Sequence, residues 1–147
     1  MTLTREAIVD GLIGLLGADK VDTDEQTLKE NSLDRYRKLE DIFGIYNLPI
    51  PAAVVRVTST DDVSKTLAFC NEHTINVVPK TGGTATEGGL ETIAENSIVI
   101  DGKAMNQIVS IDEFDMQATV QCGVKLQDLE DQLRPRGLTT GHSPQSK

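Results

Sequence analysis

Residues 51–89 read PAAVVRVTSTDDVSKTLAFCNEHTINVVPKTGGTATEGG, and the order of patterns in this stretch decides the fold class. The apolar run at 53–57 predicts a buried strand, and residues 58–73 predict a helix with Ser59 as its cap. The apolar run at 75–79 predicts a second strand. A strand, a helix and a strand within about thirty residues form a βαβ unit, so we expect parallel strands joined by a right-handed crossover.

The predicted helix carries signals for its own orientation. Val63, Leu67 and Cys70 recur at helical spacing, which places them on one face. Asp62 in the first turn and His73 at the end match the sign of the helix dipole at each terminus. We therefore expect the face with Val63, Leu67 and Cys70 to pack on the strands.

The second half of the chain predicts a third strand and then a hairpin. SIVID at 97–101 is an apolar run typical of a strand, and residues 107–123 are typical of a hairpin. Within the hairpin, MQATVQ at 116–121 alternates apolar and polar residues, which predicts a half-buried antiparallel strand. Asp112 and Asp115 are interpreted as polar turn residues rather than as a catalytic carboxylate pair.

A last helix follows the hairpin. Leu126, Leu129 and Leu133 define its apolar face, and Pro135 and Gly137 should end it. The chain as a whole therefore predicts an α+β fold, in which the βαβ unit and the hairpin form a small mixed sheet with flanking helices.

The amino-terminal segment predicts a helix of its own. Thr4 can cap this helix, and Gly17 stands where it should end. The two prolines of NLPIP at 47–51 prevent a helix from continuing. We therefore expect an N-terminal helical segment at 1–47 and a second unit at 48–147.

The composition excludes several classes of function. The 147 residues include 23 acidic and 14 basic side chains, and the net charge of −9 repels nucleic-acid phosphates. Two Tyr, three Phe and no Trp leave little aromatic surface for stacking on bases. No apolar run approaches the roughly 18 residues of a membrane span, and the stretch AIVDGLIGLLG lacks the frame of a signal peptide. We therefore expect a cytoplasmic protein with no membrane span and no nucleic-acid partner.

The sequence predicts no metal site. Cys70 and Cys122 lie far apart in helical and strand-like patterns, where small buried hydrophobic residues are typical. The acidic stretch at 19–32 lacks the ligand spacing and the central glycine of a calcium loop.

A glycine-rich stretch, PKTGGTATEGG at 79–89, follows the second predicted strand. Glycines let a ligand approach the main chain, and successive amides can then converge on a phosphate. Thr81, Thr84 and Thr86 add hydroxyl donors, and Lys80 adds a cation. The carboxyl end of a parallel strand is where ligands bind in open α/β sheets. By glycine content alone, however, an ordinary turn fits the stretch equally well.

Two common phosphate-binding motifs are excluded by the spacing. Gly83 and Gly88 fit the ends of G-x-x-x-x-G, but Gly89 and Leu90 follow where a Walker A loop needs Lys and then Ser or Thr. No G-x-G-x-x-G fingerprint occurs in this stretch either.

The succession of motifs from residue 34 to 146 is more specific than the glycine loop alone. Residues 51–89 are followed by SIVIDGKAMNQIVSIDEFDMQATVQCGVKLQDLEDQLRPRGL at 97–138 and by TTGHSPQS at 139–146. This order resembles the amino-terminal part of the FAD-binding domain of FAD-linked oxidases, the superfamily of vanillyl-alcohol oxidase and p-cresol methylhydroxylase. The resemblance implies the first subdomain of a PCMH-type FAD-binding domain, truncated at its carboxyl end.

The resemblance also implies the residues that bind the cofactor. The family's loop wraps the FAD pyrophosphate, and its positions are occupied here by Pro79, Lys80, Thr81, Gly82, Gly83, Thr84 and Ala85. A later family segment approaches the flavin, and it corresponds to Pro144, Gln145 and Ser146. Two positions depart from the family pattern, because Lys80 replaces the common arginine and Ala85 replaces a serine.

Further expectations follow from the same resemblance. Members with FAD attached covalently at this loop have a histidine where Thr84 stands, so we expect dissociable FAD. His142 could serve as an acid or base or make a structural hydrogen bond before the proline. No catalytic residue is nominated, because the isoalloxazine ring accepts the electrons in such enzymes.

Three functions remain open from the sequence. The first is a flavin oxidoreductase that oxidises a small-molecule substrate such as the 2-hydroxy acids lactate or glycolate. The second is an FAD-dependent transferase similar to alkyldihydroxyacetonephosphate synthase, because GHSPQS resembles the corresponding segment of that enzyme. The third is a flavin-free interaction domain on the same scaffold. We expect residues 1–147 alone to be inactive, because a lone loop would hold only the pyrophosphate of a long ligand.

Overall fold

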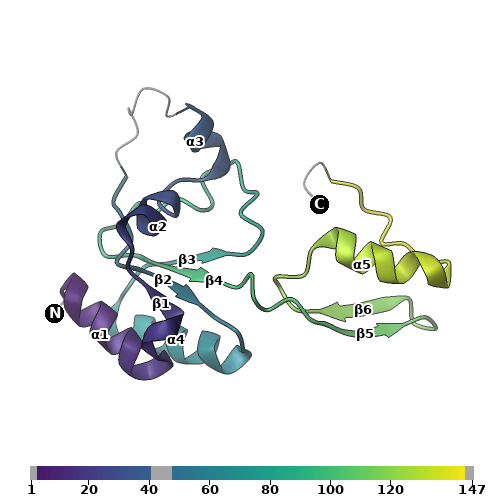
Figure 1. Cartoon of the computed structure of the whole chain (residues 1–147), viewed down its shortest axis with the longest axis horizontal. Coiled ribbons are helices and arrows are strands. Elements are labelled where there is room, and N and C mark those ends of the chain that lie inside the picture. The colour runs from purple at the N-terminus through teal and green to yellow at the C-terminus, as the bar shows by residue number, and fades with distance from the viewer. Residues whose placement is uncertain (1–2, 41–47, 145–147) are drawn as a thin grey trace.

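The protein is described here by a computed structural model, which covers residues 3–40 and 48–144, without the side chains of 38–40. Figure 1 shows a layer of helices and parallel strands from which a hairpin and a last helix project. The α-helices are α1 (Arg5–Leu16), α2 (Glu25–Glu30), α3 (Arg35–Glu40), α4 (Thr60–His73) and α5 (Leu126–Leu133). The strands are β1 (Val21–Asp22), β2 (Ala53–Arg56), β3 (Val77–Lys80), β4 (Ile98–Asp101), β5 (Ile108–Asp112) and β6 (Gln117–Val120).

The main sheet has four strands in the order β1-β2-β4-β3. Strand β4 lies between β2 and β3 and is parallel to both, so the two strands of the predicted βαβ unit are parallel but not neighbours. Strand β1 pairs with β2 in the antiparallel direction, which makes the sheet mixed. The predicted α+β class is confirmed.

The hairpin does not join this sheet. Strands β5 and β6 pair only with each other among the described strands, as a separate two-stranded sheet. The antiparallel member of the mixed sheet is instead β1, a two-residue strand in the amino-terminal segment. So short a strand leaves no periodic signal, and the sequence therefore did not reveal it.

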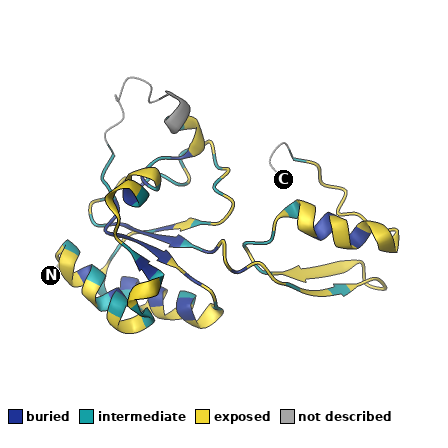
Figure 2. Ribbon diagram, in the orientation of Figure 1, coloured by how far each residue is buried: buried dark blue, intermediate teal, exposed yellow. Residues whose placement is uncertain are grey.

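Alternation along the strands divides the core between the two faces of the sheet. On one face, Val55 and Ile100 pack with Ile8 and Leu12 of α1 and with Cys70 of α4. On the other face, Leu28 of α2 packs with one residue from each parallel strand, namely Val54, Val78 and Val99. Figure 2 shows this buried layer in dark blue, enclosed by helices with exposed outer faces. Helix α1 and strand β2 lie on opposite sides of residue 47 and share this core. The division into two units at residue 47 stays a prediction.

The predicted helix caps are confirmed. Ser59 accepts a hydrogen bond of 3.1 Å from the Asp62 amide at the start of α4, and Thr4 caps α1. Gly17 ends α1 with a φ of 97°, a left-handed value that favours glycine. No helix in the described part is long and apolar enough to cross a membrane.

The buried face of α4 differs from the predicted one. Thr66 is fully buried, and its hydroxyl donates to the Asp62 carbonyl at 2.7 Å. Leu67 is 45% exposed, so its predicted place in the core is wrong. Cys70 is buried as predicted, and Val63 packs against the core. Thr66 can enter the core between Val63 and Cys70 because its hydroxyl is satisfied within the helix.

The hairpin was predicted to be half buried, and this was wrong. Strand β6 is exposed along its whole length, with Val120 at 39% exposure, and Met116 just before the strand is 73% exposed. Cys122, predicted to be buried, is also exposed. Alternation indicates which residues share a face of a strand, but burial needs a second layer against that face.

The turn between β5 and β6 and the helix α5 after the hairpin form as predicted. The Asp112 side chain accepts hydrogen bonds of 2.9 Å from the amides of Phe114 and Asp115 and so holds the turn. In α5, Leu129 and Leu133 are buried, and the helix ends in a single 3₁₀ turn at Arg134–Arg136.

Candidate functional site

A cleft of about 580 Å³ lies at the carboxyl ends of β3 and β4. Lys80 and Asp101, the last residues of these strands, are register partners, because parallel strands end at the same edge of a sheet. The chain leaves β3 into the glycine loop, which we define as residues 79–89. The cleft is lined by Lys80, Thr81, Gly82, Gly83, Thr84, Asp101, Lys103, Cys122, Gly123, Val124, Lys125 and Leu126.

The structure brings together most of the predicted pyrophosphate residues. The five residues Lys80 to Thr84 all line the cleft. Pro79 lines an adjoining apolar pocket instead, and Pro144 is not among the described residues that line the cleft. Gln145 and Ser146 lie outside the described residues.

Two neighbouring glycines of the loop have different reasons to lack a side chain. Gly83 has a φ of +65°, a left-handed conformation that L side chains rarely adopt. Gly82 has no such constraint, and a Cβ built there would come no closer than 3.7 Å to the Thr84 methyl group. The chain itself therefore leaves room for a side chain at Gly82, and its bare backbone keeps the cleft open.

The structure adds two cations that the sequence analysis missed. Lys103 follows β4 and Lys125 precedes α5, so they lie 22 positions apart in the sequence, yet both line the cleft with Lys80. Neither Lys103 nor Lys125 forms an ion pair with any described residue. Their convergence depends on the hairpin returning the chain to the edge of the main sheet, which no local pattern specifies.

The amino end of α5 also borders the cleft through Val124, Lys125 and Leu126. Lys125 is the N-cap residue, and no side chain of the described residues bonds to the first amides of the helix. Free amides at a helix start, together with the helix dipole, favour an anion. The cleft therefore has hydrogen-bond donors and positive charge on two sides.

The glycine loop is held from behind by the segment that leads into α3. Asp34 is buried and accepts hydrogen bonds from the amides of Gly88 and Arg37, while the Ala85 carbonyl accepts from the Arg35 amide at 3.3 Å. Burial alone raises the pKa of Asp34, but the amides of Arg37, Gly88 and Tyr36 and the charge of Arg37 together lower it more, so the net pKa lies below its usual value. An ionised Asp34 thus joins the loop to α3. The Lys80 ammonium donates to the Asn31 side chain nearby.

An apolar pocket of about 480 Å³ adjoins the cleft. The two hollows share Lys80, Thr81 and Cys122 as lining residues. Leu67 and Val63 of α4 line the apolar pocket, so the exposed side chain of Leu67 faces this pocket rather than the core. Polar donors and an apolar hollow side by side suit a ligand with charged and apolar parts.

Neither histidine lines the cleft. His73 packs its ring edge-on against Phe69, with a centroid separation of 4.7 Å, at the end of α4. His142 is exposed, and its backbone amide donates to the Thr140 hydroxyl at 3.3 Å. Neither arrangement identifies a catalytic acid or base.

Comparison with known proteins places this geometry in a family. The family model described as "FAD binding domain" matches residues 51–147. The chain therefore belongs to the FAD-binding domain family of FAD-linked oxidoreductases, and the predicted membership is confirmed.

The relatives agree with this assignment. The chain is 64% identical over its full length to the FAD-linked oxidoreductase YgcU of Escherichia coli (strain K12), of which it spans 30%. It is 38% identical over 96 residues, 64% of this chain and 16% of the relative, to D-lactate dehydrogenase [cytochrome] 1 of Saccharomyces cerevisiae. An alkyldihydroxyacetonephosphate synthase structure matches 97% of this chain and 27% of its own, with a TM-score of 0.83 at 22% identity, which shows a shared fold.

Proposed function

We propose that this chain is the pyrophosphate-binding part of an FAD-linked oxidoreductase, which holds FAD without a covalent bond. The observation that carries the proposal is the cleft at the strand ends, where a bare glycine loop faces the start of α5 and two lysines that form no ion pair within the described part of the chain. A pyrophosphate is the anionic, hydrogen-bond-accepting group that such a cleft fits best.

Local charge outweighs the net charge of the chain in this proposal. The protein carries a net charge of −9, which disfavours anions at long range. Within the cleft, however, Lys80, Lys103 and Lys125 face only Asp101 among the acidic lining residues. Each charge-assisted hydrogen bond to phosphate contributes roughly 1.5–3 kcal/mol, so a few of them suffice for specific binding.

The chain's own residues bind and orient in this proposal. Bound FAD would supply the electron acceptor, and the loop from Lys80 to Thr84 would hold its pyrophosphate. In the full-length protein, we propose that a 2-hydroxy acid such as lactate or glycolate is oxidised, which the similarity to a D-lactate dehydrogenase supports. A cytoplasmic location is part of the proposal, and cell fractionation tests it.

The test is titration of the full-length protein with FAD. Gly82→Ala adds a methyl group that the chain tolerates, so it should weaken FAD binding by about tenfold or more while leaving the melting temperature within a few degrees. Gly14→Ala, in α1 and facing open space within the described part of the chain, is the matched control and should leave the affinity unchanged. Equal affinity of Gly82→Ala and wild type would remove the loop from the site.

The lysines provide a second, independent arm of the same test. Lys103→Gln and Lys125→Gln should each weaken FAD binding and reduce its dependence on salt, because each removes a charge that faces the phosphates. Lys65→Gln, on the exposed side of α4, is the control. Unchanged binding in both cleft variants would contradict a phosphate role for the cleft.

Attachment of the cofactor is tested by acid precipitation. Thr84 lines the cleft, and the family resemblance implies that covalent members have a histidine at this position. Precipitation should therefore release free flavin and leave colourless protein. Flavin that stays in the pellet would contradict the proposal.

A transferase similar to alkyldihydroxyacetonephosphate synthase is the second candidate, favoured by GHSPQS at 141–146. A dye-reduction assay with D-lactate and glycolate separates the two functions, since only the oxidoreductase reduces the dye. Absence of FAD binding to the full-length protein would favour a flavin-free interaction domain.

A further inference from the structure

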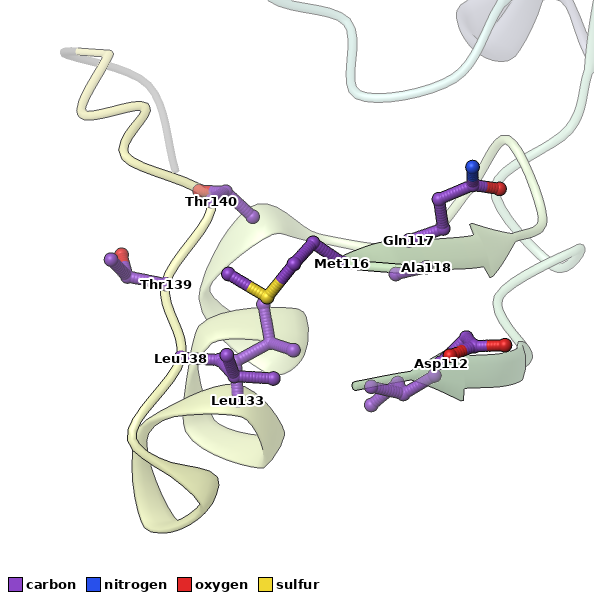
Figure 3. A pocket seen from close by; sticks show the side chains of 9 residues that line it. Asp112, Met116, Gln117, Ala118, Leu133, Leu138, Thr139 and Thr140 are labelled. Atoms are coloured by element: carbon purple, nitrogen blue, oxygen red, sulfur yellow. The ribbon is translucent and has the colours of Figure 1, made fainter. Parts of the chain in front are cut away.

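The chain turns back along α5 after the helix ends. Gly137, with a φ of 73°, makes the turn, and the Leu138 amide donates to the Leu133 carbonyl at 3.1 Å. Residues 138–144, which we call the return segment, are described and form neither helix nor strand. Figure 3 shows Leu138, Thr139 and Thr140 of this segment beside α5, with Leu138 near Leu133 and Met116. Side-chain contacts rather than a backbone ladder must therefore hold the segment.

Glu130 of α5 supplies those contacts. Its side chain is buried, and its carboxylate accepts hydrogen bonds from the Thr140 amide at 2.7 Å and the Thr140 hydroxyl at 2.6 Å. The Thr139 hydroxyl donates to it at 3.0 Å, and Arg134 forms an ion pair with it at 3.0 Å. A buried carboxylate is costly unless its lone pairs are satisfied, and here the return segment satisfies most of them.

The hydrogen bonds continue from Glu130 along the segment. The Thr139 hydroxyl oxygen accepts from the Gly141 amide at 3.2 Å, and the Thr140 hydroxyl oxygen accepts from the His142 amide at 3.3 Å. Because both hydroxyls give their protons to Glu130, their lone pairs point toward these amides. One carboxylate thus orders the backbone from residue 139 to 142.

The return segment ends beside the cleft. Gly141, His142 and Ser143 line a hollow of about 220 Å³ together with Leu126 and Gln127, the first residues of α5. Leu126 also lines the cleft at the strand ends. The segment therefore runs from the carboxyl end of α5 back to its amino end, where the cleft begins.

We infer that Glu130 is a positioning residue, which fixes the return segment so that residues 141–143 lie at the amino end of α5, beside the cofactor cleft. The inference rests on the proposed function, because the segment matters for activity only if the cleft holds FAD. The Thr140 hydroxyl and amide, with Thr139 and Arg134, lower the pKa of Glu130 to about 2 against the opposing effect of burial. Glu130 is therefore an ionised acceptor at neutral pH.

The experiment uses the full-length protein with Glu130→Ala, Glu130→Gln and the matched control Asp131→Asn, whose exposed carboxylate accepts from Gln127 on the same helix. Hydrogen exchange of flavin-free protein reports on the amides of Thr140, Gly141 and His142. Glu130→Ala should speed the exchange of these amides by about 10- to 100-fold and weaken FAD binding by a similar factor, since it removes several charge-assisted hydrogen bonds. It should also shift the absorption spectrum of bound flavin, which a purely structural role would leave unchanged.

Glu130→Gln keeps an acceptor oxygen and should restore part of both effects, while Asp131→Asn should match the wild type. Thr140→Val removes the hydroxyl that donates to Glu130. It should reduce FAD affinity less when Glu130 is already alanine than when it is made in the wild type, because the two residues act through the same hydrogen bond. Fast exchange in Glu130→Ala with unchanged FAD affinity and spectrum would overturn the inference, and so would unchanged exchange. Failure of the wild type to bind FAD would instead overturn the proposed function, which keeps the two failures distinguishable.

Discussion

The two regions of the molecule meet their structural requirements in different ways. The α/β layer, made of α1, α4 and the four-stranded sheet, buries Val55 and Ile98 completely. The hairpin unit, made of β5, β6 and α5, exposes Val109 at 63% and Phe114 at 95%. Figure 2 shows the contrast as a dark layer beside a mostly yellow arm. The four-stranded sheet is buried because helices pack on both of its faces, whereas the hairpin leaves most of its side chains exposed.

The same contrast explains where the cleft lies. It forms at the junction, where the glycine loop of the α/β layer meets the start of α5 in the hairpin unit. At this junction Gly123 approaches Gly102 closely, and its amide donates to the Met105 carbonyl at 2.8 Å. The α/β layer thus supplies the loop, the connection after β4 supplies Lys103, and the start of α5 supplies Lys125.

The largest expected effect separates the two regions directly. Ile98→Ala should lower the free energy of unfolding of residues 1–147 by roughly 2–5 kcal/mol, because it leaves a cavity in the layer. Phe114→Ala should change it by less than about 0.5 kcal/mol, since its ring contacts mainly solvent. Urea unfolding followed by circular dichroism measures both. Equal losses would break the comparison by showing that the hairpin is covered in solution.

Acid provides the next test of the layer. Burial alone raises the pKa of Asp62, but the Lys20 ammonium at 2.8 Å and the Thr58 amide and hydroxyl lower it more, so the net pKa lies far below its unfolded value of 3.8. The stabilisation is therefore full above about pH 4 and is lost as the pH falls toward the folded-state pKa.

Lys20→Met should accordingly cost roughly 1.5–3 kcal/mol at pH 7, with the difference from wild type shrinking in acid. Lys65→Met is the control, because its partner Asp61 is exposed, and it should cost less than about 1 kcal/mol. Unfolding measured from pH 7 to pH 2 checks both variants. An equal cost for the two would show that the buried pair has no special role.

Gly123→Ala tests the contact that joins the two regions. A Cβ at this position would lie 2.5 Å from the Gly102 carbonyl oxygen and 2.6 Å from that of Lys103, so the backbone must move apart. We expect a loss of roughly 1–3 kcal/mol and faster hydrogen exchange of the Met105 and Gly123 amides. Unchanged exchange at these amides would mean that the two regions are not held at this contact.

The smallest expected effect is a gain in the α/β layer. Gly14→Ala faces open space within the described part of the chain and should stabilise α1 by roughly 0.5–1 kcal/mol. Gly11→Ala on the same helix should not, because its Cβ would lie 2.6 Å from the Phe69 ring. Thermal melting distinguishes them, and an equal gain would show that Phe69 moves aside freely.

Sequence patterns described the α/β layer better than the hairpin unit. Ser59 and Gly17 were recognisable as helix ends because capping depends on hydrogen bonds and torsions within the adjacent helical turn. The alternation in MQATVQ was equally clear, yet its predicted burial was wrong, since all four residues of β6 are exposed. Leu67 is exposed and Thr66 is buried for a similar reason, because burial depends on which element packs against a face of the helix.

The sequence by itself determined the parallel strands, the glycine loop at the end of one of them, the hairpin turn and the family, because local torsions and periodic side chains encode these features. Only the tertiary structure decided that β4 lies between β2 and β3, and that Lys103 and Lys125 meet Lys80 in one cleft. It also decided that Glu130 receives the hydrogen bonds of the return segment. These contacts join residues that are distant in the chain or separated by a reversal, and their partners are set by packing rather than by any local pattern.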